Sequence, residues 1–260
     1  MTKVAPPYPE GRALLAGKTV LVTAAAGTGI GYAVARRCAE EGARIFLSDV
    51  HERRLREAAE KIERETGVRP GYQLCDVTQQ AQVDALVHAA IEAWGHVDVL
   101  VNNAGLGGYA KVVDMSDEQW SKVLDVTLTA TFRMTRAMLP HMIERGKGAI
   151  VNNASVLGWR AQEGQAHYAA AKAGVMALTR CAAMEVAEHG VRINAVSPSL
   201  ATHEFLAKIT PQGLLDQLTA REAFGRGAEP WEVANVIVFL ASDLASYMTG
   251  ECVSVSSQHP

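Results

Sequence analysis

Short apolar runs alternate with longer segments of helical periodicity along most of the chain. Each short run is apolar, too short for an ordinary helix and therefore typical of a buried strand; these runs lie at residues 19–23, 45–48, 97–101, 149–152, 192–196 and 252–255. A weaker strand is expected at 71–75. Apolar side chains recur every three or four positions in six longer segments, which predicts helices at 30–41, 52–66, 79–94, 117–143, 168–188 and 231–242.

This repeated alternation of strand and helix predicts an α/β fold. The expected architecture is a doubly wound parallel sheet with helices on both faces. No linker, repeat or low-complexity stretch interrupts the pattern, so we expect a single domain over residues 15–260 after a loosely ordered N-terminal tail at 1–14. In such sheets ligands bind beyond the carboxyl ends of the strands. Residues that directly follow a strand are therefore the first candidates for chemistry.

The composition indicates which classes of binding partner and which cellular compartment to expect. The 260 residues are 48% hydrophobic and 20% charged, with a formal charge of −3, as expected of a folded chain. A sequence pI near 6.2 and no run of Lys and Arg argue against nucleic acid as a partner. The four cysteines lie far apart and predict neither a metal site nor a disulfide framework. No apolar run could span a bilayer and the N-terminus has no signal-peptide core, so we expect a cytoplasmic protein with no membrane partner.

A glycine-containing turn, TAAAGTGIG at residues 23–31, follows the first predicted strand and leads into a helix. Glycines let the backbone approach a diphosphate, and a helix N-terminus supplies free N–H donors to hold it. The dinucleotide fingerprint GxGxxG fails by one residue, however, because Tyr32 stands where its last glycine would be. On this turn alone, a simple tight connection between strand and helix stays open as the alternative.

The end of the second predicted strand favours a dinucleotide. Asp49 lies 20 residues beyond Gly29, at the distance where an acidic side chain accepts hydrogen bonds from an adenosine ribose. A carboxylate there repels the 2′-phosphate of NADP, and the turn itself contains no Lys or Arg. We therefore expect NAD rather than NADP, although Arg53 and Arg54 follow closely and could weaken this preference.

Three further residues suit proton chemistry on a carbonyl or alcohol. Ser155 follows the fifth predicted strand, and thirteen residues later Tyr168 opens the sequence YAAAK, which ends at Lys172. Tyr168 and Lys172 are four residues apart and share one helix face. The lysine charge is expected to lower the pKa of the Tyr168 phenol and make it a proton donor and acceptor near neutrality. Ser155 could hold the substrate oxygen.

These features together resemble one family, the single-domain short-chain dehydrogenases/reductases. The resemblance covers residues 15–255 and is carried by GTGIG, CDV at 75–77, VNNAG at 101–105, Ser155, YAAAK, RINAVSP at 192–198 and YMTGE at 247–251. It implies an NAD(P)-binding Rossmann-type domain and hydride transfer between nicotinamide and a substrate carbon. It also implies a homotetramer built through the two long helices and the C-terminal segment.

The resemblance also implies roles for individual residues. Tyr168 would be the general acid/base, Lys172 would also bind the nicotinamide ribose, Ser155 would position the reacting oxygen, and Thr127 takes the place of the Asn that commonly completes the catalytic set. The implied cofactor-binding residues are Ala25, Gly27, Thr28, Gly29, Ile30, Asp49, Asp76, Val77, Asn103, Ala104, Gly105, Tyr168, Lys172, Pro198 and Ala201.

The chain departs from the family pattern in places. Ala25 stands where a glycine is usual in a turn that is one residue longer than normal, and Ser199 replaces the glycine of the usual Pro-Gly. Thr202 lies one position short of the threonine that normally meets the cofactor carboxamide, and SSQHP at 256–260 replaces the usual terminal DGG. Thr127 leaves a water-mediated proton relay through that position in doubt.

With NNASVLGWRAQ and AFGRGAEPWEVA, these departures resemble bacterial reductases of cholesterol C/D-ring breakdown. That resemblance implies an NAD-dependent interconversion of alcohol and ketone on a methyl-hydrindanone acid or its CoA thioester. Two alternatives stay open, a 3-oxoacyl-ACP/CoA reductase and a non-catalytic protein that senses the cofactor. Apolar residues within 200–228 suggest a lid over a bulky substrate, namely Phe205, Leu206, Ile209, Leu214, Leu215 and Leu218.

Four other side chains are candidates for the substrate side of the site. Tyr109 and Trp159 follow strands and could border the pocket, with core packing an equal alternative. His167 points about a quarter-turn away from Tyr168 on a helix, which favours a structural or exposed position. His203 could meet an acidic substrate, but an exposed surface position is favoured.

Overall fold

The computed structural model describes residues 4–203, 206 and 212–258 of the chain, except for the side chain of Leu214. Within these residues the strands form one parallel sheet of seven, in the spatial order β3-β2-β1-β4-β5-β6-β7. The strands are β1 (Thr19–Val22), β2 (Arg44–Asp49), β3 (Gly71–Leu74), β4 (Val99–Asn102), β5 (Gly148–Asn153), β6 (Val191–Pro198) and β7 (Cys252–Val255). The predicted α/β fold with a doubly wound parallel sheet is confirmed.

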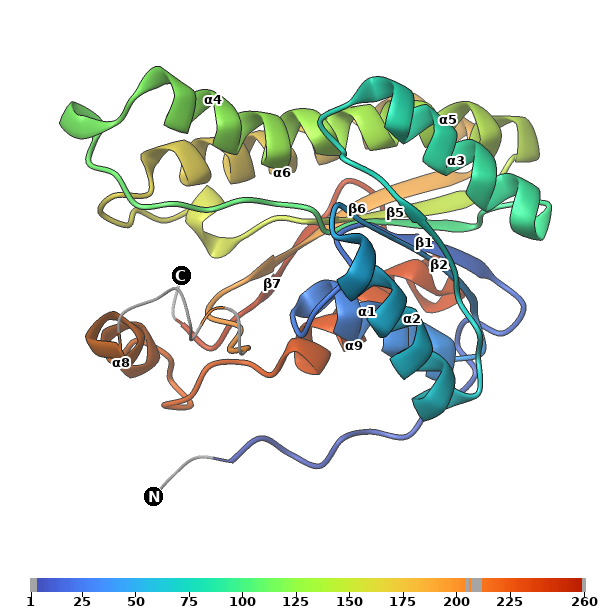
Figure 1. Ribbon diagram of the computed structural model, residues 1–260, viewed down its shortest axis with the longest axis horizontal. Coiled ribbons are helices and arrows are strands. Elements are labelled where there is room, and N and C mark those ends of the chain that lie inside the picture. The colour runs from blue at the N-terminus through green and yellow to red at the C-terminus, as the bar shows by residue number, and fades with distance from the viewer. Residues whose placement is uncertain (1–3, 204–205, 207–211, 259–260) are drawn as a thin grey trace.

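Helices cover both faces of this sheet, as Figure 1 shows. One face carries α1 (Ile30–Glu40), α2 (Glu52–Thr66) and α9 (Pro230–Ala241), and the other carries α3 (Gln80–Trp94), α4 (Asp117–Leu124), α5 (Ala130–Arg145) and α6 (Ala166–Val186). A further helix, α8 (Gln212–Ala220), lies apart from both layers, near the ends of β6 and β7. The order of the strands reverses between β1 and β4, which is where ligands bind in sheets of this kind.

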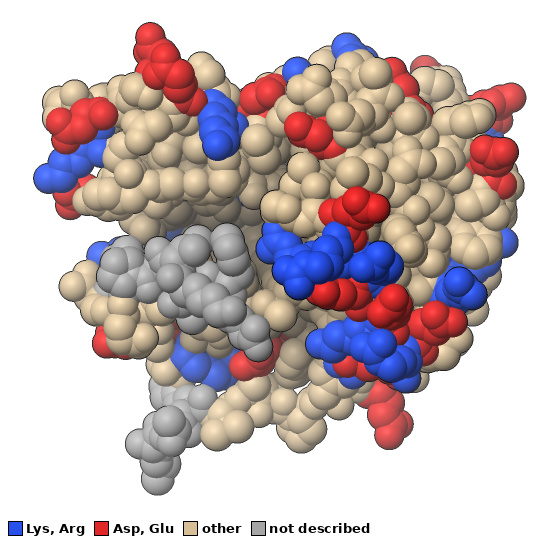
Figure 2. Space-filling view, in the orientation of Figure 1, with Lys and Arg blue, Asp and Glu red and all other residues tan. Residues whose placement is uncertain are grey.

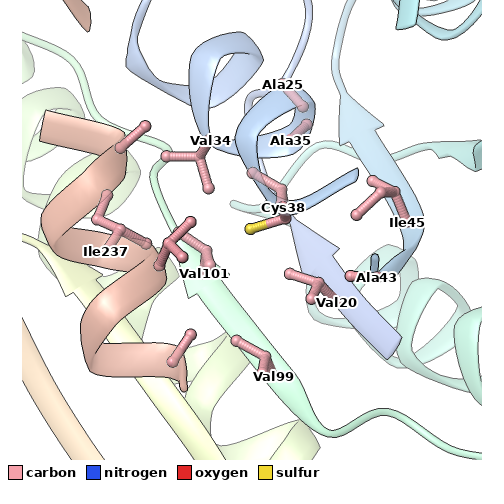
Figure 3. Packing of buried hydrophobic residues seen from close by; sticks show 14 of the residues in the cluster. Val20, Ala25, Val34, Ala35, Cys38, Ala43, Ile45, Val99, Val101 and Ile237 are labelled. Atoms are coloured by element: carbon pink, nitrogen blue, oxygen red, sulfur yellow. The ribbon is translucent and has the colours of Figure 1, made fainter. Parts of the chain in front are cut away.

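Alternate side chains of each central strand enter different cores. Val20 and Val22 of β1 pack with α1 and α9 on one face, whereas Leu21, between them, packs with α3 and α5 on the other. Figure 3 shows the first core, in which Cys38 of α1 and Ile237 of α9 lie beside Val20 and Val101 of the central strands. Because both faces are buried, these strands are continuous apolar runs. This is the pattern that made them recognisable in the sequence.

The segment expected to form one helix over 117–143 is divided in the structure. The capping box of Ser116 and Gln119 begins α4, a π-helical turn at Asp125–Thr129 follows, and α5 continues to Arg145. A π turn inserts one extra residue without ending the helix, so the apolar periodicity barely changes. The extra residue rotates the helix at Thr127, which is fully buried and faces the end of β4.

Part of the expected loose N-terminal tail is held against the domain. The Tyr8 hydroxyl donates to Glu40 at 2.7 Å, and its ring meets Trp231 of α9 edge to face at 5.4 Å. The backbone N–H groups of Arg12 and Leu14 donate to the buried carboxylate of Glu41. Side-chain anchors of this kind outweigh the proline-rich composition from which looseness was expected, and only residues 1–3 of the tail lie outside the described part.

Candidate active site

The candidate site lies at the carboxyl ends of β1, β2, β4 and β5. The glycine turn leaves β1 there, Asp49 ends β2, Asn103 follows β4, and Ser155 lies two residues beyond β5. Figure 2 shows the surface hollowed below the end of the molecule where α4 lies, with Lys and Arg side chains nearby over α1 and α2. The sheet topology thus brings together residues that are more than a hundred positions apart in the chain.

The glycine turn takes a shape that the fingerprint does not describe. Ala24 adopts a left-handed φ of +50° and Gly27 a φ of +108°, which accommodates the additional residue of the turn. A Cβ on Gly31 would lie 2.3 Å from the carbonyl oxygen of Ala24, so the close approach of helix to turn requires glycine at 31 rather than at 32. The unusual backbone is therefore at Ala24, one residue before the Ala25 position where the family pattern expects glycine.

This turn suits a dinucleotide diphosphate. Helix α1 begins after Gly29 with no side-chain cap and no acidic residue in its first turn, so its N–H donors and dipole are directed toward an anion. A Cβ on Gly27 would meet nothing within 4 Å, which leaves the backbone accessible. Thr28 is exposed, and Ile30 is half-buried as the first residue of α1.

Ala25 is placed differently from what its expected contact with the cofactor requires. It is fully buried, and its N–H donates to the carbonyl of Ser48 in β2 at 3.0 Å. Its methyl group belongs to the core between α1 and the sheet. Ala25 therefore shapes the turn from beneath instead of presenting a surface to a ligand.

Asp49 is joined directly to the turn. Its carboxylate accepts hydrogen bonds from the N–H groups of Ala26, at 3.1 Å, and His51, at 3.0 Å. The side chain is 8% exposed, and burial raises its pKa, an effect opposed by these backbone donors and by the charge of Arg54. An acceptor fixed beside the glycine turn suits a ribose diol, as the sequence spacing predicted.

Asn103 and Thr23 brace the first and fourth strands at the site. The Asn103 side chain donates to the carbonyls of Thr23 and Ala24, at 3.2 and 3.1 Å, and accepts from Asn153 at 2.9 Å. The Thr23 hydroxyl accepts from the N–H groups of Asn103 and Ala104. These bonds fix the backbone at 103–105, and the half-buried Ala104 and exposed Gly105 remain to line the site.

Lys172 is buried between α6 and the sheet. Its side chain is 2% exposed, and its Nζ donates to the backbone carbonyl of Asn153 and lies 5.6 Å from the centroid of the Tyr168 ring. Burial lowers the pKa of Lys172 to about 8. Lys172 and Tyr168 do share one helix face, as their spacing predicted.

The pKa of Tyr168 runs opposite to the sequence-based expectation. Burial raises it to about 12, and a hydrogen bond with Ser155 opposes the rise. Desolvation of the phenolate outweighs any attraction from Lys172, whose own charge is disfavoured by the same burial. The predicted lowering by Lys172 alone is therefore wrong for this structure, while the pairing of Ser155 with Tyr168 brings the expected oxygen-binding groups together.

Ser155 also shapes its own surroundings. It is 8% exposed and precedes a short 3-10 helix (Val156–Gly158), whose Leu157 N–H donates to its Oγ at 3.2 Å. The N-terminal cap position gives Ser155 an extended backbone between β5 and this turn. Its hydroxyl is thereby oriented toward the Tyr168 helix.

The Thr127 hydroxyl forms hydrogen bonds with the backbone of Leu106. Its Oγ1 accepts from the Leu106 N–H at 3.0 Å and donates to the Leu106 carbonyl at 3.2 Å. A hydroxyl has one proton to donate, and here it is directed to that carbonyl. Thr127 therefore holds the loop after β4, and its side chain is not arranged as a catalytic proton carrier.

The other predicted cofactor residues lie around the same end of the sheet. Asp76 follows β3 and accepts from both the N–H and the hydroxyl of Thr78, and Val77 is buried beside it. Pro198 ends β6 and is buried. Ala201 is 8% exposed and pairs with Ala228 as an isolated parallel bridge.

Of two histidines, His167 takes a structural position, as favoured from the sequence, whereas His203 is not at an exposed surface position. His203 is half-buried, and its ring lies 3.7 to 3.8 Å from where a Cβ on Gly29 would be. His167 is 2% exposed and its Nδ1 has no hydrogen-bond partner within the described residues, while its Nε2 lies 3.1 Å from a Cβ built on Gly108. Neither contact is local in sequence, so no spacing rule indicates it.

The substrate side of the site is partly apolar. Tyr109 and Trp159 are 60% and 51% exposed, so core packing, the alternative for both, is excluded. The Tyr109 ring lies over Gly164, in the segment that joins Ser155 to Tyr168. Of the proposed lid, Leu206, Leu215 and Leu218 are half-buried, Phe205 and Ile209 lie outside the described residues, and Leu214 has no described side chain.

The described residues contain neither a cluster of metal ligands nor a membrane-spanning helix. No group of three or more His, Cys, Asp or Glu side chains there could hold a metal ion. No helix in that part of the chain is long and apolar enough to cross a membrane.

Fold and site together define a dinucleotide-binding oxidoreductase. The family model adh_short_C2, described as Enoyl-(Acyl carrier protein) reductase, matches residues 24–257. The chain belongs to the short-chain dehydrogenase/reductase family, whose members bind a nicotinamide cofactor, and it is an enzyme that acts on a small-molecule substrate. The alternative of a non-catalytic cofactor sensor is therefore set aside.

Curated relatives are similar over nearly the whole chain. A Mycobacterium tuberculosis protein named (5R,7aS)-5-hydroxy-7a-methyl-1-oxo-2,3,5,6,7,7a-hexahydro-1H-indene-carboxyl-CoA reductase is 61% identical over 258 residues, which are 99% of this chain and 98% of the relative. The 3-oxoacyl-[acyl-carrier-protein] reductase FabG of Thermotoga maritima is 38% identical, over 93% of this chain and 97% of its own.

Solved structures agree with this placement. A short chain dehydrogenase from Mycobacterium smegmatis superposes with a TM-score of 0.89 at 56% identity, over 99% of both chains. An actinorhodin polyketide ketoreductase solved with NADPH has a TM-score of 0.88 at 36% identity, over 92% of this chain and 96% of its own. The predicted Rossmann-type fold and the resemblance to reductases of sterol-ring breakdown are thus confirmed at the level of relatedness.

Proposed function

We propose that this protein interconverts a secondary alcohol and a ketone on a bicyclic intermediate of steroid degradation, a methyl-hydrindanone acid or its CoA thioester. The observation that carries this proposal is the 61% identity, over nearly all of both chains, with the hydroxy-methyl-oxo-hexahydroindene-carboxyl-CoA reductase. The exposed apolar side chains of Tyr109 and Trp159 support it, because a fused ring system buries a large apolar surface.

The proposed proton chemistry uses Tyr168 and Ser155. A nicotinamide cofactor, when bound, supplies or accepts the hydride at the substrate carbon. In the reductive direction the Tyr168 hydroxyl donates its proton to the carbonyl oxygen, and Ser155 orients that oxygen by a hydrogen bond. The elevated pKa of Tyr168 keeps the phenol protonated and ready to donate at neutral pH.

Lys172 and Thr127 complete the proposed site. Lys172, anchored on the Asn153 carbonyl, provides a buried ammonium that favours the phenolate left behind and can reach the nicotinamide ribose. Thr127 positions the backbone of Leu106 and the neighbouring Gly105. Its role in the proposed mechanism is to support the cofactor loop, without proton transfer.

We infer that the cofactor is NAD. The support is Asp49, whose carboxylate is fixed beside the glycine turn by Ala26 and would face the adenosine ribose. A 2′-phosphate there would meet a buried negative charge. Arg54 is close enough to influence the pKa of Asp49, so the contrast between NAD and NADP depends on which charge lies nearer the ribose. The remaining predicted cofactor residues are proposed in the same roles, with Ala25 as support beneath the turn.

We also propose a cytoplasmic homotetramer. Apolar side chains are exposed on the two long helices and before β7: Phe132 of α5 is 41% exposed, Met184 of α6 79% and Tyr247 fully exposed. Exposed apolar surface on these elements is what subunit contacts would bury. Light scattering of the purified protein tests the assembly, and a monomer at micromolar concentration would contradict it.

Turnover of a substrate panel tests the activity. Purified protein with NADH is offered a methyl-hydrindanone carboxylic acid, its CoA thioester, acetoacetyl-CoA and a steroid ketone, and the corresponding alcohols are offered with NAD. We expect the ring substrates to have the highest kcat/KM. A strong preference for acetoacetyl-CoA would support the 3-oxoacyl reductase alternative, which the 38% identity with FabG favours, and would overturn our choice.

A further inference from the structure

The departure of the chain's last residues from the family pattern has a structural counterpart around Glu222. This residue follows α8 and is 4% exposed. Its carboxylate accepts from the Leu200 N–H at 3.3 Å, the Ser257 hydroxyl at 2.7 Å and the Gln258 amide at 2.8 Å. All three donors are neutral, and Glu222 forms no ion pair with any described residue. Burial removes the water that would solvate this carboxylate, so the three donors must replace it. Loss of any one donor leaves part of the desolvation cost uncompensated.

Gln258 extends this network to a charged group. While its amide nitrogen donates to Glu222, its side-chain oxygen accepts from Nη1 of Arg160, and its backbone carbonyl accepts from Nη2 of Arg160 at 3.3 Å. A primary amide satisfies the carboxylate and the guanidinium at once, since it offers a donor on one side and an acceptor on the other. Alanine, leucine or a carboxylate could not fill both roles at position 258.

The C-terminal segment is held in place independently of these side chains. The Ala223 N–H donates to the Ser257 carbonyl at 3.0 Å, and the Ser199 N–H donates to the carbonyl of Val255 at 3.2 Å. Figure 1 shows α8 at the same side of the molecule as β7. The segment thus joins the end of β6 to the residues after α8, and Gln258 lies on a fixed backbone.

Arg160 belongs to the connection between Ser155 and Tyr168. This connection is irregular at 159–165, and its N-terminal part is tied back by the bond from the Arg160 N–H to the Val156 carbonyl at 2.9 Å. Its C-terminal part is tied to the loop after β4, where the Ala110 N–H donates to the Gly164 carbonyl at 3.0 Å. The connection is therefore attached at two points. Arg160 attaches it to Gln258 of the C-terminal segment, and Gly164 attaches it to the loop after β4.

We propose that Gln258 is a positioning residue for the active site: held by Glu222, it fixes Arg160 and thereby the distance between Ser155 and Tyr168. The proposal rests on the roles proposed above for those two residues. Glu222 and Arg160 act with Gln258 as one unit, which we call the C-terminal clasp. It transmits the position of the residues after α8 to the proton-donating pair, and none of its three members is proposed to contact the substrate.

Hydrogen exchange tests the mechanical part of the proposal without any substrate. In Gln258→Leu and in Arg160→Met, we expect the amides of 157–165 to exchange about tenfold faster than in the unsubstituted protein, the effect of losing one anchoring hydrogen bond. Gln119→Leu is the matched control, because the side-chain oxygen of Gln119 also accepts a hydrogen bond, from the Ser116 N–H, but lies in the cap of α4. Unchanged exchange at 157–165 in both clasp variants would overturn the proposal.

Kinetics distinguish positioning from general destabilisation. We expect each clasp variant to lower kcat about tenfold for the best ketone while the Kd for NADH stays unchanged, since the glycine turn is not part of the clasp. The double variant Arg160→Met/Gln258→Leu should be no slower than the slower single variant, because the two residues act through one contact. Multiplied losses, or an NADH affinity that falls in parallel with kcat, would contradict the clasp.

A conservative change at Glu222 provides the rescue. Glu222→Gln keeps an oxygen for the donors of Leu200 and Gln258, and its own amide can donate to the Ser257 hydroxyl, so kcat should stay close to that of the unsubstituted protein. Glu222→Leu removes all three acceptor contacts and should match Gln258→Leu. If no ketone in the panel is reduced but exchange at 157–165 accelerates, the clasp stands and the proposed substrate fails. Normal exchange at 157–165 together with reduction of the ring ketones would overturn the clasp and support the proposed substrate.

Discussion

The ammonium of Lys172 donates a hydrogen bond to the backbone carbonyl of Asn153, the last residue of β5. A single buried side chain thus ties α6, which carries Tyr168, to the strand that leads to Ser155. Burial without a carboxylate partner among the described residues accounts for the lowered pKa of Lys172, about 8.

This burial predicts how stability changes with pH. The folded pKa of Lys172 is about 8 and its ordinary value is 10.5, so between these pH values the unfolded chain binds a proton that the folded chain has released. The free energy of unfolding contributed by Lys172 therefore rises as pH increases from 8 toward 10. Below pH 8 the folded state bears the full cost of the buried charge, on the order of 3 kcal/mol.

Lys172→Met should remove both effects. We expect the variant to be inactive, to be more stable than the unsubstituted protein at pH 7 by about 1–3 kcal/mol after loss of the bond to Asn153, and to lack the rise in stability between pH 8 and 9.5. Urea denaturation at pH 6.5 to 9.5 measures this, below the range in which Tyr168 titrates. A variant less stable than the unsubstituted protein at pH 7 would show that Lys172 is not a buried cation at a cost.

Tyr168→Phe removes the proposed proton donor and little else. We expect kcat to fall by a factor of about 10²–10⁴, the usual contribution of general acid catalysis, with the Kd for NADH unchanged. Steady-state turnover and NADH fluorescence titration measure the two quantities. Tyr72→Phe is a suitable control because Tyr72 lies exposed on β3. A Tyr168→Phe enzyme of normal activity is incompatible with the proposed mechanism.

Asp49 is expected to determine the cofactor preference. Asp49→Ala removes the acceptor for Ala26 and the proposed ribose contact, so NADH affinity should fall about 10- to 100-fold while NADPH gains relative to NADH. Asp49→Asn keeps an acceptor without the charge and should lose less NADH affinity. Fluorescence titrations with both cofactors decide this, with Glu57→Ala on exposed α2 as control. Tighter binding of NADPH than NADH by the unsubstituted protein would refute the assignment of NAD.

Thr127 is expected to act through the backbone. Thr127→Val keeps the shape of the side chain but leaves the N–H and carbonyl of Leu106 without their partner, at a cost of about 1–3 kcal/mol in unfolding free energy. Thr127→Ser keeps the hydroxyl and should retain most stability and kcat. The pH dependence of kcat should be the same in all three proteins. A shifted pH profile in Thr127→Ser or Thr127→Val would return Thr127 to a role in proton transfer.

Local patterns in the chain were sufficient to predict the fold and to propose the residues of the candidate site. Strands buried on both faces appear as short apolar runs, and the position of Asp49 beyond Gly29 indicates a dinucleotide from spacing alone. The spacing of Tyr168 and Lys172 placed them on one helix face, and the structure has them so. Each of these inferences depends on periodicity or on spacing within one or two elements.

Contacts between distant segments could not be predicted in this way. The π turn at Thr127 leaves the apolar period of its helix almost unchanged, and the attachment of Tyr8 to Glu40 and Trp231 joins segments far apart in the chain. The predicted lowering of the Tyr168 pKa was wrong for the same reason. Desolvation depends on everything packed around a group and not on one neighbour four residues away.

The pattern of apolar and polar positions along the chain therefore determined the alternation of strands and helices and the parallel sheet. It also indicated the edge of the sheet at which ligands bind, the carboxyl ends of the strands. Tertiary structure alone decided the contacts of the residues at that end: Asp49 is joined to the glycine turn and Ser155 to Tyr168, whereas Ala25 is buried beneath the turn. It also decided that Gln258 contacts Arg160. The physical reason is that hydrogen bonding and burial depend on distances in space, which the sequence encodes only through the complete fold.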